Sequence, residues 1–127
     1  MGDFHILVVE DEAISAFALE DLLTSHGYRV TVALNGLAGL EAMERDPADA
    51  ILTDLRMPKL DGKEMIRRLR ARGIDVPVIV MTGYMGFGSG RENLADKGTE
   101  PVLVLQKPID FSEVLSSLRK VVGHPAT

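Results

Sequence analysis

Apolar residues along this chain gather in two alternating kinds of segment. Five short runs lack helical spacing, and they predict strands at 4–9, 28–33, 50–54, 76–81 and 102–106. Between most of these runs, apolar residues recur at helical spacing, which predicts helices at 13–25, 37–45, about 62–72 and 110–122. Strands that alternate with helices indicate right-handed βαβ units. The expected fold is therefore α/β, with a parallel sheet covered by helices on both faces.

The helical spacing also predicts which face of each helix is buried. The expected apolar faces are Ile14, Phe17, Ala18, Leu22 and Leu23 in the first helix; Leu37, Leu40, Ala42 and Met43 in the second; Met65, Ile66 and Leu69 in the third; and Val114, Leu115, Leu118, Val121 and Val122 in the last.

The stretch from Thr82 to Glu100 departs from this alternation. It contains five glycines, and only residues 89–97 could supply the helix that the pattern calls for at this point. Each interior glycine costs a helix up to about 1 kcal/mol relative to alanine. We therefore expect this fourth helix to be short, displaced or mobile.

Composition narrows the class of protein. The 127 residues suit one domain, expected to span 1–127 with its core at about 4–122. There is no cysteine, and we find neither a membrane-length apolar run nor a signal-peptide pattern, so we expect a cytoplasmic protein. The net charge of −5 argues against direct nucleic-acid binding.

Polar side chains stand at the ends of four predicted strands. Glu10 and Asp11 follow the first strand, Asp54 ends the third, Thr82 follows the fourth and Lys107 follows the fifth. The carboxyl ends of parallel strands face one crevice, so these groups should meet there. Three carboxylates that close repel one another unless a cation joins them. Mg²⁺ is the natural candidate because it takes carboxylate, water and phosphate oxygens.

A hydroxyl and an ammonium beside such a cation suit the other oxygens of a phosphoryl group. A carboxylate can itself be the nucleophile and form an aspartyl phosphate. Taken singly, an Asp at a strand end, a Thr before Gly and a Lys before Pro are more often turn or surface residues. Their placement at corresponding strand ends favours a Mg²⁺-dependent phosphoryl-acceptor site centred on Asp54.

These motifs resemble one family over essentially the whole chain. Leu7-Val8-Val9-Glu10-Asp11-Glu12, Leu52 to Pro58 with Asp61-Gly62, Val80-Met81-Thr82-Gly83 and Gln106-Lys107-Pro108 are similar to the receiver domain of bacterial two-component response regulators (CheY-like). The resemblance implies a flavodoxin-like, doubly wound five-stranded parallel sheet with strand order 2-1-3-4-5.

The resemblance also implies roles in a phosphorelay. Asp54 would accept a phosphoryl group from a histidine kinase or a phosphotransfer protein and so switch a partner-binding surface. Mg²⁺ would be held by Glu10, Asp11, Asp54 and the backbone carbonyl of Arg56. Thr82 and Lys107 would bond the phosphoryl oxygens, and the Lys107–Pro108 peptide bond would be cis. Such a chain is a signalling module rather than a turnover enzyme.

Two features depart from the common receiver pattern. Many receivers have an aromatic residue three positions before the lysine, where this chain has Val104. Thr82-Gly83-Tyr84 resembles a subgroup, many of them stand-alone, in which the fourth helix is reduced. Our hypothesis is that phosphorylation orders residues 83–100, with Tyr84 in the aromatic role.

Other readings stay open at this stage. The chain could be a receiver cut from a larger regulator or a hybrid kinase, and its partners and oligomeric state, monomer or weak dimer, are not visible. An FMN-binding flavodoxin-like carrier would need a phosphate loop where Glu10, Asp11 and Glu12 stand. A phosphohydrolase of the haloacid-dehalogenase type would need an Asp-x-Asp pair, whereas Ala13 stands two residues after Asp11.

Overall fold

The computed structural model describes residues 4–55, 57, 59–83 and 103–122. Its strands form one parallel sheet in the order β2-β1-β3-β4-β5, so the predicted fold class and strand order are confirmed. The strands are β1 (His5–Val9), β2 (Arg29–Ala33), β3 (Ala50–Asp54), β4 (Val78–Thr82) and β5 (Leu103–Gln106).

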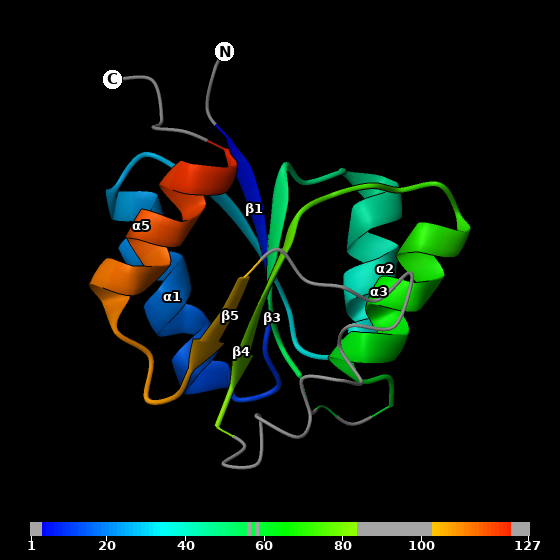
Figure 1. Ribbon diagram of the computed structural model, residues 1–127, viewed down its shortest axis with the longest axis horizontal. Helices are drawn as coiled ribbons and strands as arrows, with labels where there is room; N and C mark the ends of the chain where they lie inside the picture. Colours follow the sequence, from blue (N-terminus) through cyan, green and yellow to red (C-terminus); the bar gives the residue numbers. More distant parts are fainter. Residues whose placement is uncertain (1–3, 56, 58, 84–102, 123–127) are drawn as a thin grey trace.

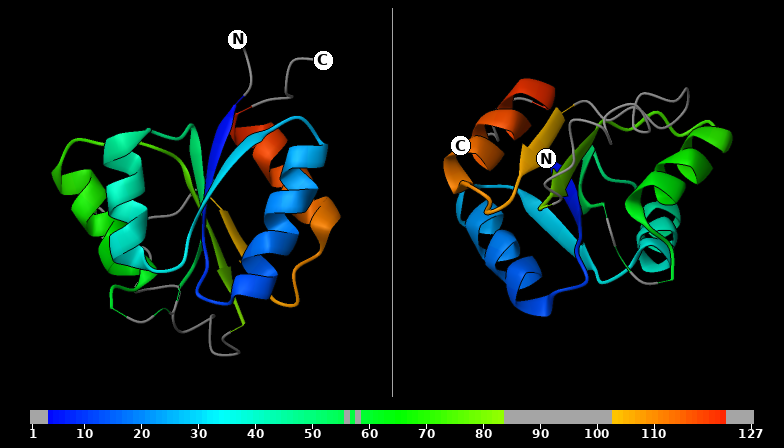
Figure 2. Two further views of the ribbon diagram at one scale, coloured as in Figure 1. Left: turned by 180° about the vertical axis from the view of Figure 1, so that it is seen from behind. Right: turned by 60° about the horizontal axis from the view of Figure 1, so that its bottom comes forward.

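Helices cover both faces of this sheet. They are α1 (Ala13–Ser25), α2 (Gly36–Arg45), α3 (Gly62–Ala71) and α5 (Phe111–Val121). Helices α1 and α5 lie on one face, and α2 and α3 lie on the other (Figures 1 and 2). The expected short helix at 89–97 lies outside the described residues. None of the described helices is long and apolar enough to span a bilayer.

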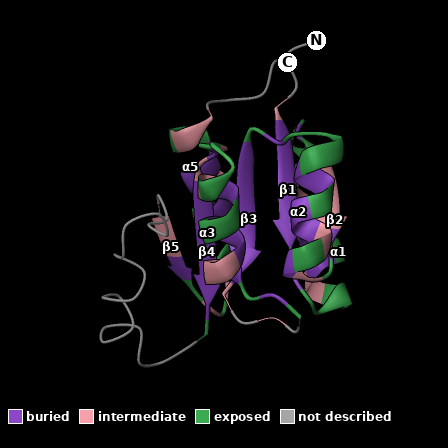
Figure 3. Cartoon of the chain, turned by 90° about the vertical axis from the view of Figure 1, so that its right-hand side faces the viewer, coloured by how far each residue is buried: buried purple, intermediate pink, exposed green. Residues whose placement is uncertain are grey.

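The central strands are buried on both faces (Figure 3), as continuous apolar runs predict for a parallel sheet. Successive side chains alternate between two cores because the strand period is two. Leu7 and Val9 pack with the α2 and α3 side, whereas Ile6 and Val8 pack with the α1 and α5 side. The sheet is therefore a rigid central layer whose carboxyl edge can hold several side chains in fixed positions.

Side-chain caps start three of the helices. The side chain of Asn35 accepts a hydrogen bond from the N–H of Ala38, and Asp61 accepts one from Glu64. Asp110 likewise accepts one from the N–H of Ser112. These caps satisfy N–H groups that have no partner inside their helices.

The predicted buried face of α1 is confirmed at Leu23 and partly at Leu22, which packs against the core, but it is wrong for the first two turns. Its buried residues are Ala16, Leu19 and Leu23, while Ile14 and Phe17 are 87% and 54% exposed. Ala18, also expected inside, is exposed as well. Apolar residues surround the first two turns of this helix, so the sequence pattern does not select one face. Packing against the sheet selects it instead.

The predicted faces of the other helices are largely confirmed. Leu40, Ala42 and Met43 of α2 are buried, but Leu37 is 41% exposed. All three predicted residues of α3 are buried. In α5, Val114 and Leu118 are buried and the other predicted residues are partly buried.

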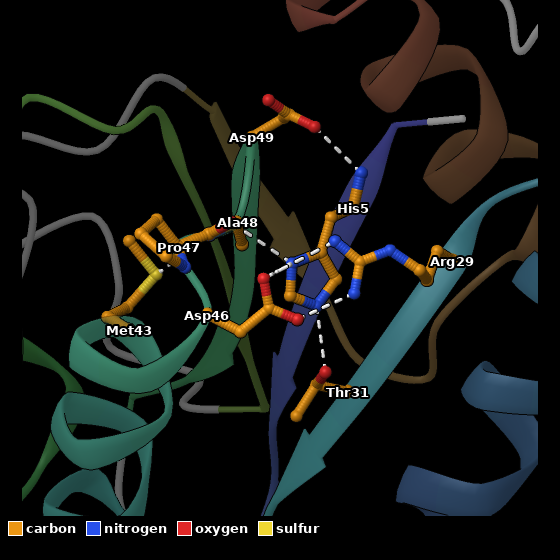
Figure 4. A network of polar contacts seen from close by, with 8 residues as sticks. All are labelled: His5, Arg29, Thr31, Met43, Asp46, Pro47, Ala48 and Asp49. Atoms are coloured by element: carbon orange, nitrogen blue, oxygen red, sulfur yellow. Dashed lines mark hydrogen bonds and ion pairs between the residues drawn. The ribbon is translucent and has the colours of Figure 1, made fainter. Parts of the chain in front are cut away.

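The amino-terminal edge of the sheet holds a polar network around the buried His5 (Figure 4). Its ring Nδ1 lies 3.1 Å from the carbonyl oxygen of Pro47, and Nε2 lies 2.7 Å from Thr31 Oγ1. Arg29 donates to Asp46 at 2.6 Å beside the ring. This histidine ties β1 to β2 and to the α2–β3 connection at the opposite edge from the acidic residues, so its contacts are structural.

Candidate functional site

The carboxyl edge of the sheet gathers the predicted chemical groups. Glu10 follows β1, Asp54 ends β3 and Thr82 ends β4. Pairing of β3 with β1 and β4 fixes their spacing, since Thr53 is opposite Val9 and Asp54 is opposite Met81. The edge is thus defined by backbone hydrogen bonds rather than by flexible loops.

Three carboxylates meet at this edge and form an acid cluster. One carboxylate oxygen from each of Glu10, Asp11 and Asp54 lies within 4.8 Å of the other two. Glu10 is 1% exposed and Asp54 is 9% exposed, whereas Asp11 is exposed. The N–H of Glu12 donates to Glu10 Oε1 at 3.1 Å and fixes that side chain. The acid cluster therefore combines two buried carboxylates with one that is exposed to solvent.

The ammonium group of Lys107 joins two of these acids. Its Nζ lies 3.0 Å from Asp54 Oδ2 and 3.2 Å from Glu10 Oε2. The backbone N–H of Lys107 donates to the carbonyl of Thr82 at 2.8 Å, which fixes the start of the β5–α5 connection. The Lys107–Pro108 peptide bond is cis, as predicted.

Burial and charge shift two pKa values within this cluster. Burial raises the pKa of Glu10, and the charge of Asp54 adds to this, against the N–H of Glu12 and the charge of Lys107. Burial also lowers the pKa of Lys107, but its hydrogen bond and charge interaction with Asp54, together with Glu10, outweigh burial and raise it. The lysine is therefore a firmly held cation beside Glu10, whose charged form is disfavoured by burial.

Thr82 is placed as expected and is 2% exposed. Val104 lies at the predicted position in β5 and packs against the core on the α2 and α3 side. Arg56, expected to offer a backbone carbonyl to the metal, and Tyr84, expected to act as an aromatic switch, lie outside the described residues. The hypothesis about residues 83–100 lies there too.

The sequence did not predict a cavity of about 290 Å³ that opens beside the acid cluster. Its lining includes the charged residues Glu10 and Lys107 and the apolar residues Leu19, Met81 and Ile109. The exposed apolar side chains Ile14, Phe17 and Phe111 lie on the same two elements, α1 and α5. The signal in the sequence is the excess of apolar residues in the first two turns of α1, where helical spacing predicts Ile14 and Phe17 in the core.

The donor set fits a hard divalent cation. Carboxylate oxygens are the ligands that Mg²⁺ prefers, and buried carboxylates close together are stabilised when a cation joins them. The acidic residues and the lysine are arranged as expected at a phospho-aspartate site. A five-stranded 2-1-3-4-5 sheet with this site at its carboxyl edge defines the class of receiver domains.

Comparison with known proteins gives the same result. The family described as Response regulator receiver domain matches residues 6–119, and the chain belongs to this family. It is thus the receiver domain of a two-component phosphorelay, a signalling module rather than a classical enzyme. Receiver domains accept phosphoryl groups from histidine kinases.

Several relatives are similar over almost all of this chain. It is 35% identical to the response regulator MprA of Mycobacterium leprae over 118 residues, which are 93% of this chain and 50% of that protein. It is 33% identical to the transcriptional regulatory protein ZraR of Klebsiella oxytoca over 94% of this chain and 26% of that protein. The chain therefore spans only a half or a quarter of these relatives.

Solved structures match the fold closely. The receiver domain of the sensor histidine kinase PA1611 from Pseudomonas aeruginosa PAO1 is 35% identical, with a TM-score of 0.83 and coverage of 95% of this chain and 98% of that one. That receiver was crystallised with a magnesium ion coordinated in its active-site cleft. The receiver domain of the Francisella response regulator 1452 is 26% identical, with a TM-score of 0.84 and coverage of 94% and 96%.

Proposed function

We propose that Asp54 is the phosphoryl acceptor of this receiver. The observation that carries the proposal is the position of Lys107, whose Nζ lies 3.0 Å from Asp54 Oδ2 inside a cluster of three acids. Asp54 is nearly buried at the end of a central strand, and two further acids lie beside it. Stability alone does not explain this arrangement, because burying charges of one sign together is costly. Nucleophilic attack on a phosphoryl group explains all four side chains at once.

The acid cluster would hold one Mg²⁺ ion. Glu10, Asp11 and Asp54 supply the carboxylates, and the backbone carbonyl of Arg56 is the expected further ligand. When bound, the ion would offset negative charge on the transferring phosphoryl group. The magnesium ion in the related PA1611 receiver supports this assignment.

The residues around Asp54 would then carry the transfer. A carboxylate oxygen of Asp54 attacks the phosphorus of a phosphohistidine, an O–P bond forms and the P–N bond breaks. The electron pair of that P–N bond stays on the imidazole nitrogen, which takes up a proton. Lys107 moves its ammonium from the carboxylates to a phosphoryl oxygen, and the Thr82 hydroxyl bonds another.

The donor would approach over the exposed end of α1. A phosphohistidine must reach the carboxyl edge of the sheet, and the cavity beside that edge shares Glu10 and Lys107 with the site. The exposed side chains of Ile14 and Phe17, in the first turns of α1, and of Phe111, at the start of α5, are named here the donor face. Exposed apolar groups of this kind mark surfaces that bind proteins, and a histidine kinase or phosphotransfer protein is the partner that the chemistry requires.

Further parts of the proposal concern the context of the site. We propose a single receiver domain over residues 1–127, with its core at about 4–122, acting in the cytoplasm as a monomer or weak dimer. Phosphorylation would change the surface that a downstream protein reads, without direct binding to nucleic acid. Val104 in place of an aromatic residue requires a switch other than the usual pair with Thr82.

Phosphotransfer from candidate kinases tests the proposal. The native chain should take up one phosphoryl group per molecule in a Mg²⁺-dependent reaction. Intact mass would give the number of groups per chain, and assays of acid-stable and acid-labile phosphate would show which kind of bond holds them. Asp54→Asn should take up none while keeping its circular dichroism spectrum. Uptake that persists in Asp54→Asn, or repeated turnover of phosphate esters, would overturn the assignment.

A further inference from the structure

We propose that Thr53 is a positioning residue for the phosphoryl acceptor and acts through its buried hydroxyl group. Thr53 comes directly before Asp54 on β3, and its Oγ1 donates a hydrogen bond to the backbone carbonyl oxygen of Asp54 at 2.9 Å. This bond holds the peptide group that follows Asp54 and, through it, the direction of the Asp54 carboxylate. The inference rests on the acceptor role proposed above for Asp54.

Strand pairing holds the peptide after Asp54 from one side only. Toward β1, the last matched residues are Val9 and Thr53, whereas toward β4 Asp54 is still opposite Met81. On that second side the N–H of Leu55 donates to the carbonyl of Met81 at 3.2 Å. Asp54 is 9% exposed, and a backbone carbonyl with so little access to water requires a donor from the protein. The Thr53 hydroxyl is such a donor.

The first residue of α3 lies against the same carbonyl. A Cβ atom on Gly62 would lie 2.6 Å from the carbonyl oxygen of Asp54, so a side chain at this position would displace one of the two backbones. The N–H of Gly62 also donates to the carbonyl of Leu55 at 2.9 Å. The Asp54 carbonyl therefore contacts the Thr53 hydroxyl and the backbone of α3, and both contacts restrict rotation of this peptide group.

Packing alone does not account for the hydroxyl of Thr53. The residue is 0% exposed, and its matched neighbours on β1 and β4 are Val9 and Val80, which belong to the core on the α2 and α3 side. Valine has nearly the shape of threonine and would fill this apolar position as well. Burial of a hydroxyl is costly unless it is hydrogen-bonded, and the bond to Asp54 meets that requirement.

The proposed reaction depends on a fixed place for the Asp54 carboxylate. Its Oδ2 lies 3.0 Å from Lys107 Nζ, and one of its oxygens lies within 4.8 Å of oxygens from Glu10 and Asp11. These three partners belong to other segments of the chain, so a shift of the Asp54 backbone changes all of these distances together. A misplacement of about 1 Å can cost about 10²-fold in rate. Loss of the Thr53 hydroxyl should therefore slow phosphorylation.

Thr53→Val and a matched control, Thr31→Val, test this inference. Thr31 lies on β2, and its Oγ1 lies 2.7 Å from His5 Nε2 in the polar network at the other edge of the sheet (Figure 4). Both substitutions remove a hydrogen-bonded hydroxyl from the sheet, so both should lower the midpoint of urea unfolding. Only Thr53→Val should lower the rate of phosphorylation by a small acyl phosphate at saturating Mg²⁺, by about 10-fold.

Thr53→Ser provides the rescue experiment. Serine keeps the hydroxyl but lacks the methyl group, so Thr53→Ser should lose stability and still be phosphorylated at close to the native rate. Equal rates in Thr53→Val and the native chain would overturn the inference and leave the acceptor assignment intact. A Thr53→Ser rate as low as that of Thr53→Val would also overturn it, because packing would then be the cause. If the native chain takes up no phosphoryl group, the proposed function fails and the inference with it.

NMR of the native chain gives a measurement that applies even if Thr53→Val does not fold. A hydroxyl proton that is buried and donated to a carbonyl is protected from exchange with water, so the Thr53 hydroxyl should give its own signal. That signal should shift on phosphorylation, because the acceptor of the hydrogen bond belongs to the phosphorylated residue. An absent signal, or one that phosphorylation leaves unchanged, would overturn the inference.

Discussion

At the scale of single residues, Lys107 supplies the positive charge that lies beside two carboxylates of the acid cluster. Its ammonium lies close to Asp54 and Glu10, and both acids are nearly buried. Taking carboxylates out of water is costly unless a counter-charge is present. The raised pKa of Glu10 records that cost, and the raised pKa of Lys107 records the compensating attraction. One lysine therefore provides the counter-charge for both buried acids.

Replacing Lys107 should separate transfer from metal binding. In Lys107→Met the rate of phosphorylation by a small acyl phosphate should fall by about 10²-fold, because one charge-stabilising donor is lost from the transition state. Mg²⁺ affinity should be unchanged or higher, since a competing cation leaves the carboxylates. Rate and calorimetric measurements would check this, with the exposed Lys120→Met on α5 as control. Weaker Mg²⁺ binding in Lys107→Met would contradict it.

Asp46 provides a prediction on pH at the opposite edge of the sheet. The hydrogen bond from Arg29 lowers the pKa of Asp46 below its ordinary value of 3.8, and the charges of Arg29 and His5 act in the same direction (Figure 4). An acid with a depressed folded-state pKa adds stability above its unfolded-state pKa. That stability is lost as the pH falls through the folded-state value.

Comparison of the native chain with Asp46→Asn isolates this effect. At about pH 6 the native chain should have the larger free energy of unfolding in urea, and the difference should shrink as the pH falls below about 4. Other acids with lowered pKa values, Glu64 and Asp110, are the same in both proteins. A difference that stays constant down to about pH 3 would show that the ion pair does not act through Asp46 titration.

At the scale of elements, α1 has two distinct apolar faces. Ala16, Leu19 and Leu23 pack against the sheet, whereas Ile14 and Phe17 point to solvent near the site. Only the first face contributes to the core, because only it removes apolar surface from water. The outer face of the first two turns adds nothing to the core, so it is available for the donor binding proposed above.

Stability measurements distinguish the two faces. Leu23→Ala should lower the free energy of unfolding by about 2–5 kcal/mol, since a fully buried leucine is removed. Phe17→Ser should change it by no more than about 0.5 kcal/mol, because that side chain is exposed. Urea unfolding of both variants is the measurement. A large loss in Phe17→Ser would restore Phe17 to the core and remove it from the donor face.

Phosphotransfer distinguishes the donor face from other exposed apolar residues. Phe17→Ser should reduce the rate of transfer from a cognate kinase by about 10-fold or more, as expected for an anchor residue at an interface. Phosphorylation by a small acyl phosphate should not change, since that donor needs no docking surface. Leu37→Ser is the matched control, because Leu37 is 41% exposed and lies on α2, which covers the other face of the sheet (Figure 1). Equal losses in both variants would contradict a localised donor face.

At the scale of the whole molecule, the sheet brings together groups that are far apart in sequence. Glu10 and Lys107 are separated by 97 positions, yet their side chains are in contact. Binding of a cation at this shared edge should therefore stabilise the entire fold, because the unfolded chain has no such cluster.

Thermal unfolding tests this coupling. Mg²⁺ at about 100 times its dissociation constant should stabilise the native chain by about 2.7 kcal/mol and raise its Tm. Asp11→Ala should show a much smaller rise, because the exposed member of the acid cluster is lost while the buried core is unchanged. The control is a Ca²⁺-free buffer without Mg²⁺, in which added Na⁺ gives the same ionic strength. An equal rise in Asp11→Ala would mean that Mg²⁺ acts elsewhere.

The amino-acid sequence alone was enough to predict how strands and helices alternate along the chain and which side chains belong to the candidate site. Strand runs and helical spacing are local properties, so the alternation was visible before any packing was known. Glu10, Asp54, Thr82 and Lys107 could be placed at one edge because parallel strands have a common direction. The resemblance to receiver domains supplied the strand order, which local patterns do not contain.

The buried face of each helix and the contacts that position the site could be seen only in the folded chain. Ile14, Phe17 and Leu37 fit the helical spacing as well as the buried residues do. The spacing alone therefore does not show which residues are buried, because burial depends on where the sheet lies. The approach of Leu60 to Gly36 joins segments that no local pattern connects. Distances between backbones from different parts of the chain arise from packing, and those distances turn a set of acids at strand ends into a defined site.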